Sequence, residues 1–136
     1  MIKIVFFDRD GVLIKNYGYV HKVDHLKWLK GSISAIKYLN KKKIKVVVIT
    51  NQSGVARGYY SEKDVIVFHK LMNKKLKKNS AKIDKFIYCP YHPKSKILKY
   101  KKNSNLRKPN NGMIKLGLKK YKLSFTNAFM IGDKKS

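Results

Sequence analysis

Two acidic residues, Asp8 and Asp10, follow an apolar run at residues 2–7 and precede Gly11. Such a run, β-branched and aromatic, indicates a buried strand that opens into a tight loop. Side chains two positions apart in extended backbone point the same way, so both carboxylates can face one small volume. They repel each other unless a cation lies between them or one is protonated, and Mg²⁺ with a substrate phosphate meets that need. The pattern therefore indicates Mg²⁺-dependent phosphoryl transfer, with an ordinary acidic turn as the alternative.

A polar segment follows a second apolar run, and it begins Thr50, Asn51, Gln52 and Ser53. Hydroxyl, amide and main-chain N–H groups at the end of a strand donate hydrogen bonds to phosphate oxygens. Two glycines further along let the backbone approach a ligand closely. The segment is therefore a candidate phosphate site, and an ordinary polar turn between strand and helix is the alternative.

Two bases and a third acid complete the set. Arg107 and Lys108 come just before a predicted helix, and Asp133 follows the last apolar run. A lysine beside a transferring phosphoryl group neutralises charge on the nucleophile and on the equatorial oxygens. Asp133 is placed to complete a metal site with Asp8 and Asp10. For the two bases, the alternative is simply two more cations in a basic protein.

The apolar runs predict the elements that must position these residues. Strands are predicted at 2–7, 44–50, 83–88 and 127–131. Helices are predicted at 32–42, after the N-cap Ser61 with Asp64 in a capping box, and from about Asn111. Alternating strands and helices indicate an α/β fold, a doubly wound parallel sheet, in one domain of residues 1–136. Ligands of such sheets bind outside the carboxyl ends of the strands, where the candidate residues fall.

The composition is strongly basic, with 33 lysines and arginines against 7 acids and a formal charge of +26. Such a charge suggests an anionic partner such as nucleic acid. Arginine, the better residue for bidentate contacts to phosphates and base edges, is nevertheless scarce. We interpret most of the charge as lysines on solvent-facing surfaces, and expect nonspecific polyanion binding in either case.

The single cysteine, Cys89, excludes an internal disulfide framework and fits a reducing compartment. No stretch has the length of a membrane span, and the first apolar run is too short for a signal peptide. We therefore predict a cytoplasmic protein that does not bind membranes, and we expect it to act as a monomer.

The ordered set of motifs resembles the haloacid dehalogenase superfamily of phosphatases, whose core is Rossmann-like, over essentially the whole chain. Within that superfamily the sequence most resembles the D,D-heptose 1,7-bisphosphate phosphatases. The segments that carry the closer match are 8–11, 17–21, 50–58, 89–93 and 107–113. In that family, removal of the C7 phosphate feeds nucleotide-activated heptose synthesis for lipopolysaccharide or related surface glycans.

The resemblance implies a role for each candidate residue. Asp8 would form an aspartyl-phosphate, and Asp10 would protonate the leaving sugar oxygen and then activate water. Thr50 and Lys108 would hold the phosphoryl oxygens, and Arg107 would help to recognise the substrate. The sugar pocket would be lined by Asn16, Tyr17, Gly18, Tyr19, Asn51, Gln52 and Ser53. The Mg²⁺ ligands would be Asp8, the main-chain carbonyl or carboxylate of Asp10, and Asp133.

The sequence departs from this resemblance in two places. Many relatives hold the long loop, here residues 89–109, with a structural zinc bound by a Cys-x-His pair and a Cys-x-Cys pair. Cys89 is kept, but Tyr91, Ser104 and Leu106 stand at the other three positions, so zinc is not expected. Relatives also continue beyond the Gly-Asp motif, so one or more C-terminal strands are expected to be absent, leaving an unpaired edge at the fourth strand.

Three functional hypotheses stay open. The first is the sugar bisphosphatase, and the second is a histidinol-phosphate phosphatase or a polynucleotide 3′-phosphatase of the same superfamily. The third is an inactive, polyanion-binding fragment whose lysines alone interact with partners. The basic loop at 89–109 fits either an anionic substrate or a mobile, solvated flap.

Overall fold

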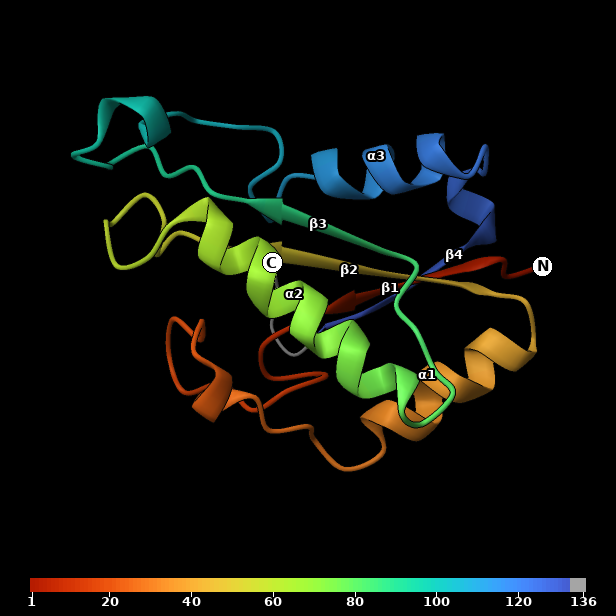
Figure 1. The fold of residues 1–136 in the computed structure, drawn as a ribbon. Coiled ribbons are helices and arrows are strands. Elements are labelled where there is room, and N and C mark those ends of the chain that lie inside the picture. The colour runs from red at the N-terminus through yellow and green to blue at the C-terminus, as the bar shows by residue number, and fades with distance from the viewer. Residues whose placement is uncertain (133–136) are drawn as a thin grey trace.

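In the computed structural model, which describes residues 1–132, the chain forms a parallel four-stranded sheet with helices on both faces (Figure 1). The strands are β1 (Ile4–Asp8), β2 (Lys45–Asn51), β3 (Lys85–Cys89) and β4 (Ala128–Ile131). The helices are α1 (Ser32–Lys41), α2 (Glu62–Lys77) and α3 (Gly112–Lys120), with 3₁₀ turns at Val23–His25, Leu98–Tyr100 and Phe125–Asn127. The strand order β3-β2-β1-β4 confirms the predicted doubly wound α/β sheet.

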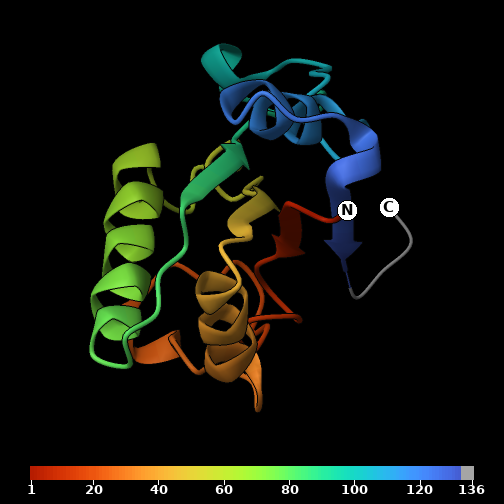
Figure 2. The same cartoon turned by 90° about the vertical axis from the view of Figure 1, so that its right-hand side faces the viewer.

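Helices α1 and α2 cover one face of the sheet and α3 covers the other (Figure 2). Successive residues of β1 face opposite layers, and this alternation builds a core on each side of the sheet. Val5 and Phe7 belong to the cluster that includes α1 and α2, whereas Ile4 and Phe6 belong to the cluster that includes α3. A Cβ at Gly117 of α3 would lie 2.5 Å from the Phe6 ring, so this close approach requires glycine. The end of β1 is therefore held between two packed layers.

Helix α2 begins directly after the predicted N-cap, Ser61. The Ser61 hydroxyl oxygen accepts a hydrogen bond from the main-chain N–H of Asp64 (3.1 Å), and the Asp64 carboxylate accepts one from the N–H of Ser61 (2.9 Å). These hydrogen bonds lower the pKa of Asp64. The predicted capping box is confirmed, and it satisfies two N–H groups that the helix itself leaves without partners.

The third strand begins later than predicted, at Lys85 rather than at residue 83. The N–H and C=O of Ile83 bond to the side-chain amide of Asn73 on α2, at 2.8 and 2.9 Å. The carboxylate of Asp84 then accepts the N–H of Val46 (2.8 Å), which takes the place of a ladder bond between strands. Side chains thus satisfy the backbone just before β3, and an apolar pattern alone does not reveal such contacts.

Strand β4 lies at one edge of the sheet and, within residues 1–132, pairs with β1 alone. Its side chains Phe129, Met130 and Ile131 are 49%, 39% and 38% exposed. These three apolar side chains are therefore partly open to solvent. No helix within residues 1–132 combines the length and apolar character that crossing a membrane requires.

The packing of α2 against the core predicts that substitutions at two of its positions change the free energy of unfolding by different amounts. Met72 is fully buried, and Val67 on the same helix is 54% exposed. We expect Met72→Ala to lower the free energy of unfolding by about 2–5 kcal/mol, because it leaves a cavity. Val67→Ala should change it by less than about 0.5 kcal/mol. Urea unfolding measures both, and equal effects would contradict the described packing.

Candidate active site

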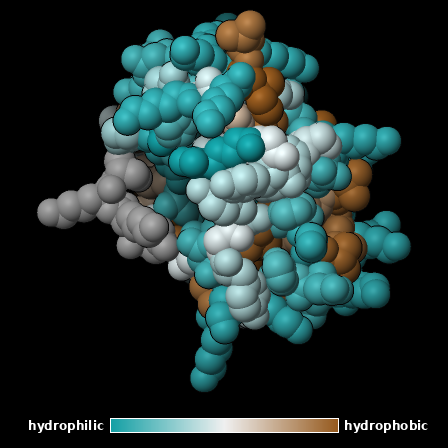
Figure 3. All heavy atoms as spheres, turned by 90° about the vertical axis from the view of Figure 1, so that its left-hand side faces the viewer, coloured by the Kyte–Doolittle hydropathy of each residue, from teal (hydrophilic) through white to brown (hydrophobic). Residues whose placement is uncertain are grey.

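The carboxyl ends of β1 and β2 lie side by side, and the loops that follow them meet at this edge of the sheet (Figure 1). Asp8 is the last residue of β1 and pairs with Ile49 of β2, so Thr50 follows at the neighbouring strand end. Figure 3 views this edge, and hydrophilic residues cover most of it. The parallel order of the strands thus brings the acid and hydroxyl segments together.

Lys108 reaches this edge from the segment before α3, and its Nζ forms an ion pair with Oδ1 of Asp8. The side chain of Asn51 fixes the backbone of Lys108. Its Oδ1 accepts the N–H of Lys108 (3.0 Å), and its Nδ2 donates to the Lys108 carbonyl (3.4 Å). The structure thus places the Asn51 amide on the backbone of Lys108, and its predicted place in a sugar pocket stays a prediction.

Asp10 pairs with a different cation from the one that pairs with Asp8. Its partner is Arg9, which lies between the two acids in the sequence. Arg9 Nε and one terminal nitrogen donate to the two carboxylate oxygens of Asp10, at 2.7 and 3.1 Å. The guanidinium also donates to the carbonyl of Val20 (2.7 Å). Arg9 is only 1% exposed. The sequence prediction missed this role, although an arginine between two acids at a buried strand end was a signal for it.

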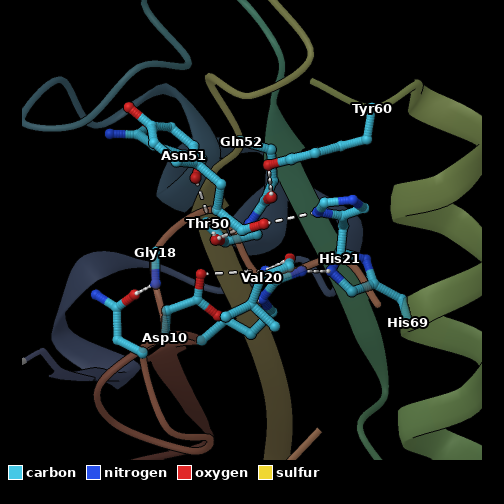
Figure 4. Close-up of polar contacts among 12 residues, drawn as sticks. Asp10, Gly18, Val20, His21, Thr50, Asn51, Gln52, Tyr60 and His69 are labelled. Atoms are coloured by element: carbon cyan, nitrogen blue, oxygen red, sulfur yellow. Dashed lines mark hydrogen bonds and ion pairs between the residues drawn. The ribbon is translucent and has the colours of Figure 1, made fainter. Parts of the chain in front are cut away.

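Thr50 is held by a chain of hydrogen bonds that starts at Tyr60 (Figure 4). The Tyr60 hydroxyl donates to Oε1 of Gln52 (2.6 Å), and Nε2 of Gln52 donates to the hydroxyl oxygen of Thr50 (2.8 Å). Because Thr50 accepts at its oxygen, its own proton is left to donate; here it faces the Asn51 carbonyl at 3.5 Å. The chain therefore leaves the Thr50 hydroxyl free to act as a donor.

The Tyr60 ring lies in a tight space. A Cβ at Gly54 would lie 2.2 Å from that ring, so only glycine lets the phenol come this near. His21 stacks on the ring with centroids 4.4 Å apart. Burial raises the pKa of Tyr60 to about 12, so its hydroxyl keeps the proton that it donates to Gln52. Gln52 is itself 2% exposed, and both ends of its amide are bonded, one of them to Thr50. Its predicted contact with the sugar stays a prediction.

The segment from Asn16 to Tyr19 forms an exposed turn near the site. Oδ1 of Asn16 accepts the N–H of Gly18 (2.9 Å), and Gly18 has a φ of 85°. Tyr17 and Tyr19 are 45% and 44% exposed, and Tyr19 packs edge-on against Tyr59, with centroids 5.0 Å apart. This arrangement leaves two aromatic rings open to a ligand.

Ser53 and Arg107 are partly buried. Within residues 1–132, the Arg107 guanidinium makes no hydrogen bond or ion pair. The hydrogen bonds of Arg107 are made by its main chain, with Ser104 and Asn110. Both residues keep polar groups that a substrate can bind. The structure brings Asp8, Asp10 and Lys108 to the end of β1, as predicted from the sequence.

The oxygen donors at the end of β1 fit a magnesium ion. Oδ2 of Asp8 is not used by Lys108, and both carboxylate oxygens of Asp10 accept from Arg9. Within the described chain, the main-chain carbonyl of Asp10 accepts no hydrogen bond, which leaves it as the free donor of that residue. The third predicted ligand, Asp133, lies outside the described residues. Residues 1–132 contain no cluster of three His, Cys, Asp or Glu, so any such set needs Asp133 or main-chain oxygen.

The four positions where relatives would hold zinc do not fit that metal. Cys89, Tyr91 and Leu106 pack in the apolar cluster beside α3, and burial raises the pKa of the Cys89 thiol. Ser104 is buried, and its hydroxyl oxygen accepts the N–H of Leu106 (3.1 Å). Tetrahedral zinc requires about four nitrogen or sulfur ligands, and this set supplies one. The absence of zinc stays a prediction.

The loop at 89–109 is tied to α2 by a carboxylate. The hydroxyls of Tyr88 and Tyr100 donate to Oε1 and Oε2 of Glu62, each at 2.8 Å. Burial and the bond to Glu62 raise the pKa of Tyr88. The buried hydroxyl of Ser95 donates to the carbonyl of Ala56 (2.6 Å). The loop therefore has direct protein anchors near the site. Its exposed lysines are Lys94, Lys96, Lys99, Lys101 and Lys102.

Comparisons with known proteins identify relatives of this chain. The family described as polynucleotide kinase 3 phosphatase matches residues 3–135. A D-glycero-beta-D-manno-heptose-1,7-bisphosphate 7-phosphatase of Haemophilus influenzae is 40% identical over 134 residues, which cover 98% of this chain and 72% of the relative. A D-glycero-alpha-D-manno-heptose-1,7-bisphosphate 7-phosphatase of Photorhabdus laumondii is 35% identical over 135 residues, 99% and 74% of the two chains.

Among solved structures, D,D-heptose 1,7-bisphosphate phosphatase from B. bronchiseptica, complexed with magnesium and phosphate, is similar with a TM-score of 0.84. The sequence identity is 29%, over 97% of this chain and 70% of that one. The fold and the site thus define a haloacid dehalogenase-like phosphatase, a hydrolase of phosphoric monoesters. More narrowly, the chain belongs to the polynucleotide kinase 3 phosphatase family.

The chain of hydrogen bonds at Thr50 predicts the effect of removing one hydroxyl, that of Tyr60. Tyr60→Phe removes the donor to Gln52 and frees its amide to turn, so that the Thr50 proton is drawn to Gln52 instead of phosphate. Loss of about 1 kcal/mol should weaken inhibition by inorganic phosphate roughly fivefold. Tyr59→Phe is the control, because Tyr59 is 56% exposed. Equal inhibition constants for Tyr60→Phe and the unchanged protein would refute the role of this chain.

Proposed function

We propose that the chain is a Mg²⁺-dependent phosphatase that removes the C7 phosphate of D-glycero-D-manno-heptose 1,7-bisphosphate through an aspartyl-phosphate. The observation that carries the proposal is the pairing of Asp8 with Lys108 beside Thr50, at the carboxyl end of the central strands. A nucleophile, a cation and a hydroxyl donor then surround one phosphoryl position. The hydrophilic edge seen in Figure 3 suits a phosphorylated sugar.

In the first half-reaction, a carboxylate oxygen of Asp8 attacks phosphorus and the bond to the sugar oxygen breaks. Asp10 donates a proton to that leaving oxygen. In the second half-reaction, the ionised Asp10 takes a proton from water, the water oxygen attacks phosphorus, and the bond to Asp8 breaks. Lys108 and the Thr50 hydroxyl hold the phosphoryl oxygens during both steps.

The oxygen donors described above suit magnesium, with Asp8, the main-chain carbonyl of Asp10 and Asp133 as its ligands. When bound, the ion neutralises charge on the transferring phosphoryl group. Around this centre, Arg107, Ser53 and the turn at Asn16 to Tyr19 are the candidate contacts to the sugar and its second phosphate. Their groups are polar or aromatic and are open to solvent or partly so.

The substrate is proposed from the relatives, whose names include both the beta and the alpha anomer of the heptose bisphosphate. On this proposal the reaction supplies nucleotide-heptose and lipopolysaccharide precursor synthesis in the cytoplasm, carried out by a monomer. The family description and the charge of +26 favour a second candidate, a 3′-phosphatase of polynucleotides. Histidinol phosphate is a further small ester to compare.

The substrate test compares release of phosphate from these three compounds with and without Mg²⁺. We expect turnover of the heptose bisphosphate only with Mg²⁺, and ³¹P NMR should show loss of the C7 phosphate. Asp8→Asn should reduce the rate on the order of 10³-fold or more, because it removes the nucleophile. Asp24→Asn is the control, since Asp24 lies in an exposed 3₁₀ turn and should keep full activity.

Faster turnover of a 3′-phosphorylated oligonucleotide than of the sugar would contradict the substrate proposal. No turnover of any ester would support the inactive polyanion-binding fragment. In that case DNA binding should survive Asp8→Asn and fall steeply with salt, because phosphate contacts release counterions.

A further inference from the structure

Arg9, the partner of Asp10, makes a further contact with a residue that the mechanism above does not use. The remaining terminal nitrogen of Arg9 lies 3.1 Å from Nε2 of His69, on helix α2, 60 residues later in the chain (Figure 4). An arginine N–H only donates, so Nε2 of His69 accepts and the ring proton is on Nδ1. The contact thus joins α2 to the motif at the end of β1.

His69 is held on both sides and stays uncharged. Its ring stacks on Phe86 of β3 with centroids 4.2 Å apart and planes inclined by 12°. Burial, and then the charge of Arg9, lower the pKa of His69 to about 3. The imidazole is therefore a neutral acceptor throughout the physiological pH range.

The guanidinium of Arg9 is fixed on every side. Two of its hydrogen bonds go to Asp10, one to the Val20 carbonyl and one to His69, and its carbon lies 4.9 Å from the centre of the Phe68 ring. A fork that binds both oxygens sets the plane of a carboxylate, as single contacts do not. Each oxygen of Asp10 keeps a further lone pair for a proton or for water.

We propose that Arg9 and His69 are a pair of positioning residues that hold the Asp10 carboxylate in the orientation its proton transfers require. This inference rests on the proposed function, in which Asp10 is the acid and then the base. His69 prevents the guanidinium from rotating, and the guanidinium prevents the carboxylate from rotating. Neither residue touches the substrate.

The test uses His69→Phe, which keeps a ring against Phe86 but removes the acceptor, and His69→Gln, which offers an amide oxygen in its place. With a sugar phosphate we expect His69→Phe to lower kcat about 10- to 100-fold, with KM changed less than about twofold. His69→Gln should recover most of that loss. Met72→Ala is the matched control, because it weakens the same helix without touching Arg9.

A substrate with a good leaving group distinguishes a loss of Asp10 orientation from a general loss of enzyme activity. With 4-nitrophenyl phosphate the leaving group needs no proton, so His69→Phe should keep the first step and slow the second, in which Asp10 activates water. We expect a burst of nitrophenolate equal to the enzyme present. Equal losses for both esters with no burst, or an unchanged kcat for the sugar phosphate, would overturn the proposal. Met72→Ala should leave the ratio of the two esters unchanged.

Two further measurements keep the inference testable if His69→Phe does not fold. Arg9→Lys retains the buried charge but loses the fork, and it should show the same burst. In the unchanged protein, ¹⁵N NMR should find His69 protonated at Nδ1, and a proton at Nε2 would overturn the proposal. The NMR result does not depend on turnover, so an enzyme that fails on the heptose substrate refutes the proposed function without deciding this inference.

Discussion

The carboxyl end of β1 carries three charged residues in succession, and the site depends on a separate cation for each of its two carboxylates. Lys108 pairs with Asp8, and Arg9 pairs with Asp10. Removing a buried charge from water costs several kcal/mol unless it is paired and hydrogen-bonded. Both pairs meet that condition, since no buried side-chain nitrogen or oxygen in residues 1–132 lacks a partner. The carboxylates can therefore lie near each other in the folded chain.

Most of the other acidic residues in the described part of the chain also have a defined partner. The chain has only 7 acids against 33 bases, and five of the six acids in the described part have a specific structural partner. These five are Asp8 with Lys108, Asp10 with Arg9, Glu62 with Tyr88 and Tyr100, Asp64 with Ser61, and Asp84 with Val46. The acids therefore stand where the fold or the chemistry uses a carboxylate. The lysines mostly cover solvent-facing surface.

Much of this fold and of its site could be predicted from local patterns. Apolar runs located all four strands within about two residues, and strand ends located the acid and hydroxyl segments, because ligands of parallel sheets gather there. The partners of individual side chains could not be predicted. Gln52 and Asn51 are amides in the segment proposed to bind phosphate, and only the folded chain shows that they bond to Thr50 and Lys108. Arg9 meets a histidine on another element, which no local pattern reveals.

The central claim is that Asp8 becomes covalently phosphorylated during turnover, and chemical trapping tests it most directly. Borohydride added during turnover reduces an aspartyl-phosphate to homoserine, and peptide mass spectrometry identifies the residue that was modified. The account predicts homoserine at position 8 alone, only when both substrate and Mg²⁺ are present. Steady release of phosphate with Asp8 unmodified, or homoserine at another acid, would contradict it.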